Sequence, residues 1–145
     1  METITTSRTM EKRGEINQVL NGESQSLLLV QGPCAPDIDG ISQLMDEAHD
    51  LNHVTRSMIP GLVAVNRLPI WKPRSDPASW SGIHSSHPEA ADALINEIDD
   101  QYGMAGIEIG LSSHVINFAS RIAFGWTGAR NVHNRRLMQK LAAAE

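Results

Sequence analysis

Four apolar segments that alternate with amphipathic segments constrain the fold of this chain more than any other feature. The apolar segments begin near Leu27, Leu62, Ala105 and Gly125, and the segments between them carry apolar residues at steps of three and four. Short continuous apolar runs are typical of strands that are covered on both faces. Strict alternation of strand and helix implies a parallel sheet with right-handed crossovers. The pattern therefore predicts an α/β fold.

The chain divides into an extension over residues 1–25, in which a short helix is predicted at Glu11–Leu20, and an α/β domain over residues 26–145. The predicted strands span residues 27–30, 62–65, 105–109 and 125–129, and further helices are expected from Asp37 or Asp39, from Pro88, from Ser112 or Ser113, and around Leu137–Leu141. Two architectures fit this order: an open doubly wound sheet, and the first half of an eight-stranded barrel. No Gly-x-Gly-x-x-Gly string follows the first strand, so the dinucleotide-binding interpretation is weak.

Composition excludes several classes of protein. With 12 Lys and Arg against 17 Asp and Glu, the net charge is −5, and no basic run is dense enough to follow a nucleic-acid backbone. No apolar run approaches the roughly 20 residues that a membrane span requires. The single cysteine excludes an intramolecular disulfide and agrees with a cytoplasmic protein. We therefore expect partners other than nucleic acid or membrane.

Residues suited to binding an anion gather at the predicted carboxyl ends of the strands, where parallel α/β folds place their sites. Cys34 follows the first strand, three cations follow the second, Glu108 ends the third and Arg130 ends the fourth; the three cations are Arg67, Lys72 and Arg74. Arginine offers a planar fork that matches phosphate and carboxylate oxygens. The cluster favours a small phosphorylated ligand, and the alternative is that these charges form ion pairs or lie solvated in loops.

Three strings identify a resemblance. Gly32-Pro33-Cys34 follows the first strand, Arg67 precedes Lys72-Pro73-Arg74 by five residues, and Gly128-Ala129-Arg130 ends the fourth strand. In this order and at these intervals the strings resemble the amino-terminal half of class I 3-deoxy-D-arabino-heptulosonate 7-phosphate (DAHP) synthases. The resemblance implies the (β/α)4 half of a TIM (β/α)8 barrel. It also implies a transferase that condenses phosphoenolpyruvate with erythrose 4-phosphate at the entry to the shikimate pathway.

The resemblance assigns a role to each matching position. Cys34 corresponds to a ligand of a divalent metal (Mn, Fe, Co or Zn), and Arg67 and Arg130 correspond to arginines that hold phosphoenolpyruvate in a pocket lined by Glu108. The string Lys72-Pro73-Arg74 corresponds to residues that meet both substrates, with Lys72 near the reacting atoms as the catalytic residue. Ser75 stands where the family usually has threonine, and it keeps the hydroxyl.

The chain also departs from the family pattern. Asn131–Asn134 replaces the usual Thr-Thr-Glu-Ser, and Leu111 replaces an acidic residue. The family's other metal ligands come from later strands, and His84 and His133 are the candidate substitutes here. We therefore expect a truncated synthase that is inactive as this chain alone and that forms a homo-oligomer or pairs with a complementing chain. Activity is expected only when the partner carries strands five to eight. The alternative is a non-catalytic anion-binding remnant that pairs with another synthase chain.

A half-barrel has a physical consequence that the sequence also predicts. Closure into eight strands leaves no sheet edge, whereas four strands leave two. The inner apolar face is expected to be uncovered as well, which invites association with another chain.

Overall fold

The computed structural model describes residues 5–33, 40–71, 82–109, 113–126, 139–140 and 143. In chain order it contains α1 (Ser7–Leu20), β1 (Leu27–Gln31), α2 (Ile41–His53), the π-helical turn η2 (Val54–Met58), β2 (Leu62–Leu68), α3 (Ile83–Ser86), α4 (Pro88–Tyr102), β3 (Ala105–Glu108), the 3₁₀ helix η3 (Ser113–Arg121) and β4 (Phe124–Trp126). This order confirms the alternation of strands and helices that the sequence predicts.

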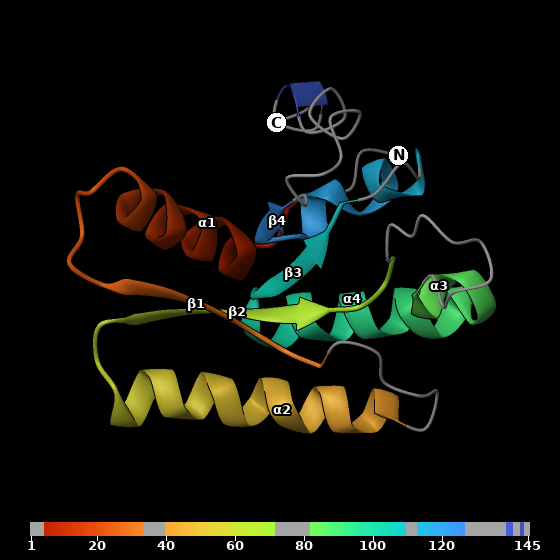
Figure 1. Cartoon of the computed structure of the whole chain (residues 1–145), viewed down its shortest axis with the longest axis horizontal. Helices are drawn as coiled ribbons and strands as arrows, with labels where there is room; N and C mark the ends of the chain where they lie inside the picture. The colour runs from red at the N-terminus through yellow and green to blue at the C-terminus, as the bar shows by residue number, and fades with distance from the viewer. Residues whose placement is uncertain are drawn as a thin grey trace.

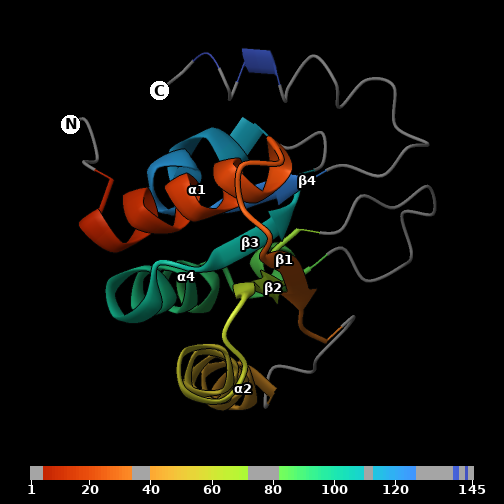
Figure 2. The same cartoon turned by 90° about the vertical axis from the view of Figure 1, so that its left-hand side faces the viewer.

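The four strands form one parallel sheet in the order β1-β2-β3-β4. Leu28 of β1 pairs with Val63 of β2, and Arg67 of β2 pairs with Gly106 of β3. The sheet is curled, with α2 and α4 on its outer face and α1 across its inner face (Figures 1 and 2). Because the connections between strands pack on one and the same face, the fold is the (β/α)4 half of a (β/α)8 barrel and not a doubly wound sheet.

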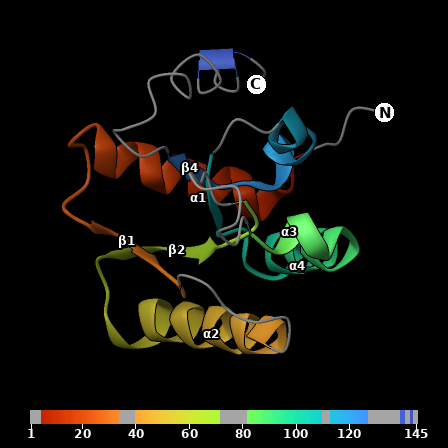
Figure 3. The ribbon, with the colours of Figure 1, turned by 45° about the vertical axis from the view of Figure 1, so that its right-hand side comes forward.

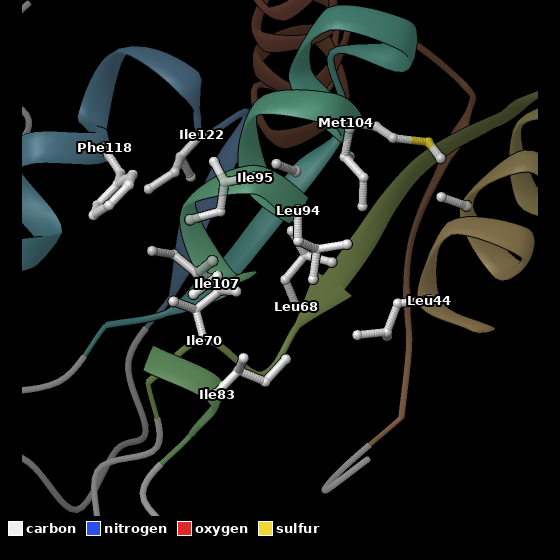
Figure 4. Close-up of a cluster of buried hydrophobic side chains, with 14 of the residues drawn as sticks. Leu44, Leu68, Ile70, Ile83, Leu94, Ile95, Met104, Ile107, Phe118 and Ile122 are labelled. Atoms are coloured by element: carbon white, nitrogen blue, oxygen red, sulfur yellow. The ribbon is translucent and has the colours of Figure 1, made fainter. Parts of the chain in front are cut away.

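The main core lies between the outer face of the sheet and the helices that connect its strands (Figure 4). Its fully buried members come from all of these elements and include Leu44 of α2, Leu68 of β2, Ile95 of α4 and Ile107 of β3. Apolar residues at steps of three and four along α2 and α4 produce this packing. The buried amide of Asn66 is satisfied there, since its Nδ2 donates to the carbonyl of Leu44 at 3.5 Å.

The ends of α4 follow the local sequence. Pro88 occupies the first turn, where its missing N–H costs nothing. Gly103 ends the helix in the left-handed conformation, and its N–H bonds the carbonyl of Asp99 at 3.0 Å. Both signals are visible in the sequence, and the helix predicted to begin at Pro88 is confirmed.

Helix α1 covers the inner face at the amino-terminal ends of the strands. Ile16 of α1 is buried with Val63 and Val65 of β2, and Leu28 of β1 packs against the same cluster. The expectation of an uncovered inner face is therefore wrong for the amino-terminal half of the strands. Val30 of β1 keeps 37% of its surface exposed, so the cover is incomplete toward the β1 edge.

Polar contacts hold the amino-terminal end of α1 on the carboxyl end of α4. The hydroxyls of Thr6 and Thr9 both donate to Oδ1 of Asp99, the first at 2.7 Å. Thr9 and Asp99 are buried, and a Cβ at Gly103 would lie 2.4 Å from the backbone of Arg8. The fit at this contact therefore requires glycine at the end of α4.

A single arginine fixes the middle of α1 to η3. Arg13 donates from Nε to the carbonyl of Ile122 at 3.1 Å and from Nη2 to the carbonyl of Ala119 at 2.5 Å. These carbonyls belong to the last turn of η3 and to the residue after it, where positive charge is favourable.

Several element boundaries differ from the predictions. Helix α1 begins at Ser7 and not at Glu11, because Thr6 caps it by accepting from the N–H of Thr9 at 3.2 Å. Strand β2 continues to Leu68, so Arg67 lies within the strand and does not follow it. Strand β3 ends at Glu108, one residue before the predicted end.

The remaining differences concern helices. The segment Ser113–Arg121 is a 3₁₀ helix where an α-helix was predicted. The short helix α3 was missed because the residues around it are polar, although Ile83 itself is buried. The proposed helix caps Asp37 and Asp39 and most of the predicted last helix lie outside the described residues.

Candidate functional site

The structure places two of the predicted site residues, Arg67 and Glu108, and both lie at the carboxyl ends of neighbouring strands. The other predicted site residues lie outside the described residues: Cys34, Lys72, Pro73, Arg74, Ser75 and Arg130. Of the two histidines considered as metal ligands, His84 is described and His133 is not. The described part of the site therefore consists of residues near the carboxyl ends of β2, β3 and β4.

Arg67 projects from the inner face of β2. Side chains alternate along a strand, and Val63 and Val65 belong to the cluster beneath α1 on that face. Asn66, which lies between Val65 and Arg67, faces the opposite way, and its side chain bonds the backbone of α2. Arg67 is therefore held over the inner face by a strand whose two neighbouring positions are fully buried.

Two glycines flank Arg67 and allow the neighbouring residues to approach closely. A Cβ at Gly32, just after β1, would lie 2.2 Å from the carbonyl oxygen of Arg67 and 2.9 Å from its Cβ. On the other side Gly106 pairs with Arg67 across β2 and β3. A Cβ at Gly106 would lie 2.2 Å from Cγ1 of Val65, so close packing on both sides of Arg67 requires glycine.

Glu108 and Trp126 form the next layer toward the carboxyl ends. They are paired across β3 and β4, and both are partly buried. A Cβ at Gly106 would lie 3.1 Å from Cζ3 of Trp126, so the indole extends across β3 over the glycine. Trp126 also stacks on Phe124, with ring centres 6.0 Å apart and an angle of 29° between the rings.

Toward the carboxyl ends of the strands, the inner face combines the guanidinium of Arg67, the carboxylate of Glu108 and the indole of Trp126 over Gly106. We call this region the upper inner face. A guanidinium binds phosphate or carboxylate oxygens in a bidentate manner, and an aromatic wall lowers the local dielectric and strengthens that contact. Glu108 neutralises positive charge and accepts hydrogen bonds from a ligand hydroxyl. These groups suit a small planar anion.

Sequence reasoning missed Trp126 and the two glycines. Trp126 lies in a predicted strand, but which face it occupies depends on a register that a single sequence does not fix. Gly32 was noted as part of a turn, and its contact with Arg67 is visible in three dimensions alone. The alternation of residues along β4 was the one available signal for Trp126.

Backbone hydrogen bonds join the residues before Trp71 to those after Gly82. The N–H of Ile83 donates to the carbonyl of Pro69 at 3.0 Å, and the N–H of His84 donates to the carbonyl of Ile70 at 3.1 Å. Gly82 adopts φ +111°, and a Cβ there would lie 2.2 Å from the carbonyl oxygen of Ile70. The chain therefore leaves β2 and returns to α3 at one place, beside α4 (Figure 3).

A metal centre does not form among the described residues. No three His, Cys, Asp or Glu side chains within them lie close enough to hold an ion. Structural and catalytic metals in proteins need three or four ligands in fixed geometry. The described part of the chain therefore does not fit a metal by itself, and Cys34 lies outside it. Within that part no helix is long and apolar enough to cross a membrane.

Comparison with known proteins agrees with this architecture. The model of the DAHP synthetase I family matches residues 3–145. The solved structure of phospho-2-dehydro-3-deoxyheptonate aldolase from Francisella tularensis SCHU S4 superposes with a TM-score of 0.73 at 21% sequence identity. The match covers 86% of this chain and 39% of that one, so the chain spans about two fifths of the solved protein's length. No curated protein sequence matches the chain.

Proposed function

Because the chain belongs to the DAHP synthetase I family, we propose that it carries the phosphoenolpyruvate-binding half of a synthase. The family reaction joins phosphoenolpyruvate to erythrose 4-phosphate and opens aromatic amino acid biosynthesis. The observation that carries the proposal is the upper inner face, where Arg67 and Glu108 lie on the adjacent strands β2 and β3, with the indole of Trp126 over Gly106 beside them. Phosphoenolpyruvate offers both a carboxylate and a phosphate, and a guanidinium binds the oxygens of either group.

The residues take the roles that the family resemblance implies. Arg67 and Arg130 hold the phosphate and carboxylate of phosphoenolpyruvate, and Glu108 lines the same pocket. Lys72 lies near the aldehyde of erythrose 4-phosphate and polarises it, while Arg74 meets the phosphates. Pro73 belongs to the string that meets both substrates, and the hydroxyl of Ser75 serves in place of the usual threonine.

The chemistry is an aldol-type condensation. C3 of phosphoenolpyruvate attacks the aldehyde carbon of erythrose 4-phosphate and forms the new C–C bond, and the aldehyde oxygen takes up a proton. Water adds at C2, and inorganic phosphate leaves as the C2 carbonyl forms. Positioned charges that stabilise the developing alkoxide supply much of the acceleration in such a step. We assign no step to a metal, and Cys34 stands as the ligand that a divalent ion would use.

The proposal includes a partner that completes the barrel. Strands β1 and β4 form the two edges of the sheet, and each lacks a neighbouring strand on its outer side within the described residues. Open edges of a parallel sheet pair readily with further strands. A second copy of the chain or a complementing chain with strands five to eight would close the barrel. The single cysteine agrees with a cytoplasmic location of that assembly.

A second candidate is a non-catalytic anion-binding module that associates with a complete synthase. It is supported by the absence of a three-ligand group among the described residues, beside an intact Arg67 and Glu108. Such a module would bind phosphoenolpyruvate without converting it.

A complementation assay separates the two candidates. DAHP formation is measured with purified chain, with a polypeptide that carries strands five to eight, and with both together, in each case with and without divalent metal. We expect turnover with both polypeptides and no more than trace turnover with the chain alone. Lys72→Ala and Cys34→Ala should abolish the combined activity, whereas the exposed control Glu23→Gln should retain it. Phosphoenolpyruvate binding without turnover in any mixture would favour the second candidate.

A further inference from the structure

We propose that Trp126, stacked on Phe124, forms an aromatic platform under the bound anion, and that this platform selects a planar acid over a tetrahedral acid of the same charge. The inference rests on the proposed function, because it refines how phosphoenolpyruvate lies in the same site. Trp126 ends β4 and pairs with Glu108 of β3. It is a specificity-determining residue, and we give it no part in the bond-forming steps.

The indole lies on the inner face of the sheet, above the apolar cluster beneath α1. Phe124 packs against this cluster, so it occupies the inner face. Trp126 follows by two residues and therefore points to the same side of the strand. The two rings stack, with centres 6.0 Å apart and 29° between their planes. Phe124 thus supports one face of the indole, and the opposite face is directed toward the carboxyl ends of the strands.

Gly106 lets the indole extend across β3 toward β2. A Cβ at this position would lie 3.1 Å from Cζ3 of Trp126, and Gly106 pairs with Arg67 on its other side. Since Cζ3 belongs to the benzene-ring edge of the indole, this edge is directed toward the strand that carries Arg67. The face of an aromatic ring is electron-rich and its edge is electron-poor. We therefore expect anionic oxygens beyond this edge, on the side of Arg67, and uncharged carbons over the face.

The platform is held in place before a ligand binds. The carbonyl of Trp126 accepts from the N–H of Ile109 at 2.7 Å. Between the two stacked residues, a Cβ at Gly125 would lie 2.6 Å from Cδ1 of Ile109, so the other side of β4 packs closely against a buried side chain. Groups that are ordered in advance lose less entropy on binding. The platform therefore adds affinity without a large ordering cost.

Phosphoenolpyruvate has the shape that such a platform selects. Its carboxylate is conjugated with the C2–C3 double bond, so these atoms favour one plane. Phospholactate carries the same carboxylate and phosphate, but its C2 is tetrahedral and its methyl group stands out of the plane. A flat ring therefore contacts more carbons of the planar acid. Removing an aromatic ring from under a stacked nucleobase weakens binding by about tenfold or more, and we expect the lower end of that effect for this smaller group.

Calorimetric titration of both compounds tests the platform. The parent should bind phosphoenolpyruvate about tenfold more tightly than phospholactate. Trp126→Leu should lower this preference to less than about threefold by weakening phosphoenolpyruvate binding, whereas Trp126→Phe keeps a flat ring and should retain most of the preference. The matched control is Phe118→Leu, which removes a ring that lies 5.3 Å from that of Trp71 in the main core. It should leave the preference unchanged.

Indole emission gives a second readout, which also decides the test if Trp126→Leu does not fold. Saturation with phosphoenolpyruvate should shift the emission of the parent, and Trp126→Phe should lose that shift while it still binds. A shift retained in Trp126→Phe, or a preference unchanged in Trp126→Leu, overturns the platform and leaves the proposed function intact. Equal affinity of the parent for both compounds has the same consequence. A parent that binds neither compound contradicts the proposed function, and the platform with it.

Discussion

The two faces of the sheet differ in what their residues do. The outer face is covered by α2, α4 and η3, and most of its side chains in β2 and β3 are apolar and buried, with Asn66 as a buried polar residue that bonds α2. The inner face is apolar only in its lower part, beneath α1, and carries Arg67, Glu108 and Trp126 above. One face of the sheet therefore packs in the main core. The other face changes from apolar at the amino-terminal ends of the strands to charged and aromatic at their carboxyl ends.

The difference between the two faces indicates which residues serve stability and which serve binding. On the outer face any well-packed apolar residue of suitable volume satisfies the fold. On the upper inner face two glycines stand beside a charged residue, although glycine weakens a strand by leaving nothing to pack. Close packing accounts for both glycines, because a Cβ at Gly32 would meet the backbone of Arg67 and one at Gly106 would meet Val65. The charged residues Arg67 and Glu108 are what distinguish this part of the face from the core.

The largest effect on stability is expected from the outer face. Ile95→Ala removes a fully buried side chain of α4 and should lower the free energy of unfolding by about 2–5 kcal/mol. Phosphoenolpyruvate affinity of the folded fraction should stay unchanged, because the residue lies on the far side of the sheet. Chemical denaturation and titration check both parts. A loss below about 1 kcal/mol would contradict the assignment of this face as the core.

A smaller effect is expected from the glycine beside Arg67. In Gly106→Ala the new Cβ would lie 2.2 Å from Cγ1 of Val65 and 3.1 Å from Trp126, and Val65 is fully buried. Overpacking of this kind costs about 1–3 kcal/mol. The matched control is Gly14→Ala in α1, which meets nothing within 4 Å and should stabilise the helix by roughly 0.5–1 kcal/mol. Equal thermal shifts in the two variants would show that a methyl group fits at Gly106, and they would contradict the close packing there.

The smallest effect is expected where α1 is held over the inner face. Asp99→Asn keeps an acceptor oxygen for Thr6 and Thr9 but removes the charge, which should cost about 1 kcal/mol of unfolding free energy. The neighbouring exposed residue offers a control, and Asp100→Asn should change stability by less than about 0.5 kcal/mol. If Asp99→Asn is as stable as its control in thermal unfolding, the contact with α1 contributes nothing.

Much of the fold could be predicted from the sequence because the outer face follows periodic rules. Leu44 and Ile95 recur at helical spacing, and Pro88 and Gly103 mark the ends of α4. The cover of the inner face could not be predicted in this way. The amino-terminal turn of α1 is polar, and its burial depends on Asp99, which lies 90 residues away in the chain from Thr9.

The site was predictable in type and not in detail. Arg67 and Glu108 were identified as charged residues near strand ends, and the structure places both on adjacent strands. Their shared face depends on a register that a one-residue shift would reverse. The ring contacts of Trp71 and the place of Trp126 over Gly106 arise from packing between elements, for which the sequence has no local signal.

The central claim is that the upper inner face binds phosphoenolpyruvate through Arg67, and calorimetric titration tests it most directly. The parent chain should bind phosphoenolpyruvate measurably. Arg67→Ala should weaken that binding at least about tenfold, since a charge-assisted contact is worth roughly 1.5–3 kcal/mol. Arg56→Ala, an exposed arginine on η2, should bind like the parent. Absence of binding to the parent, or equal affinity in Arg67→Ala and Arg56→Ala, would contradict the account.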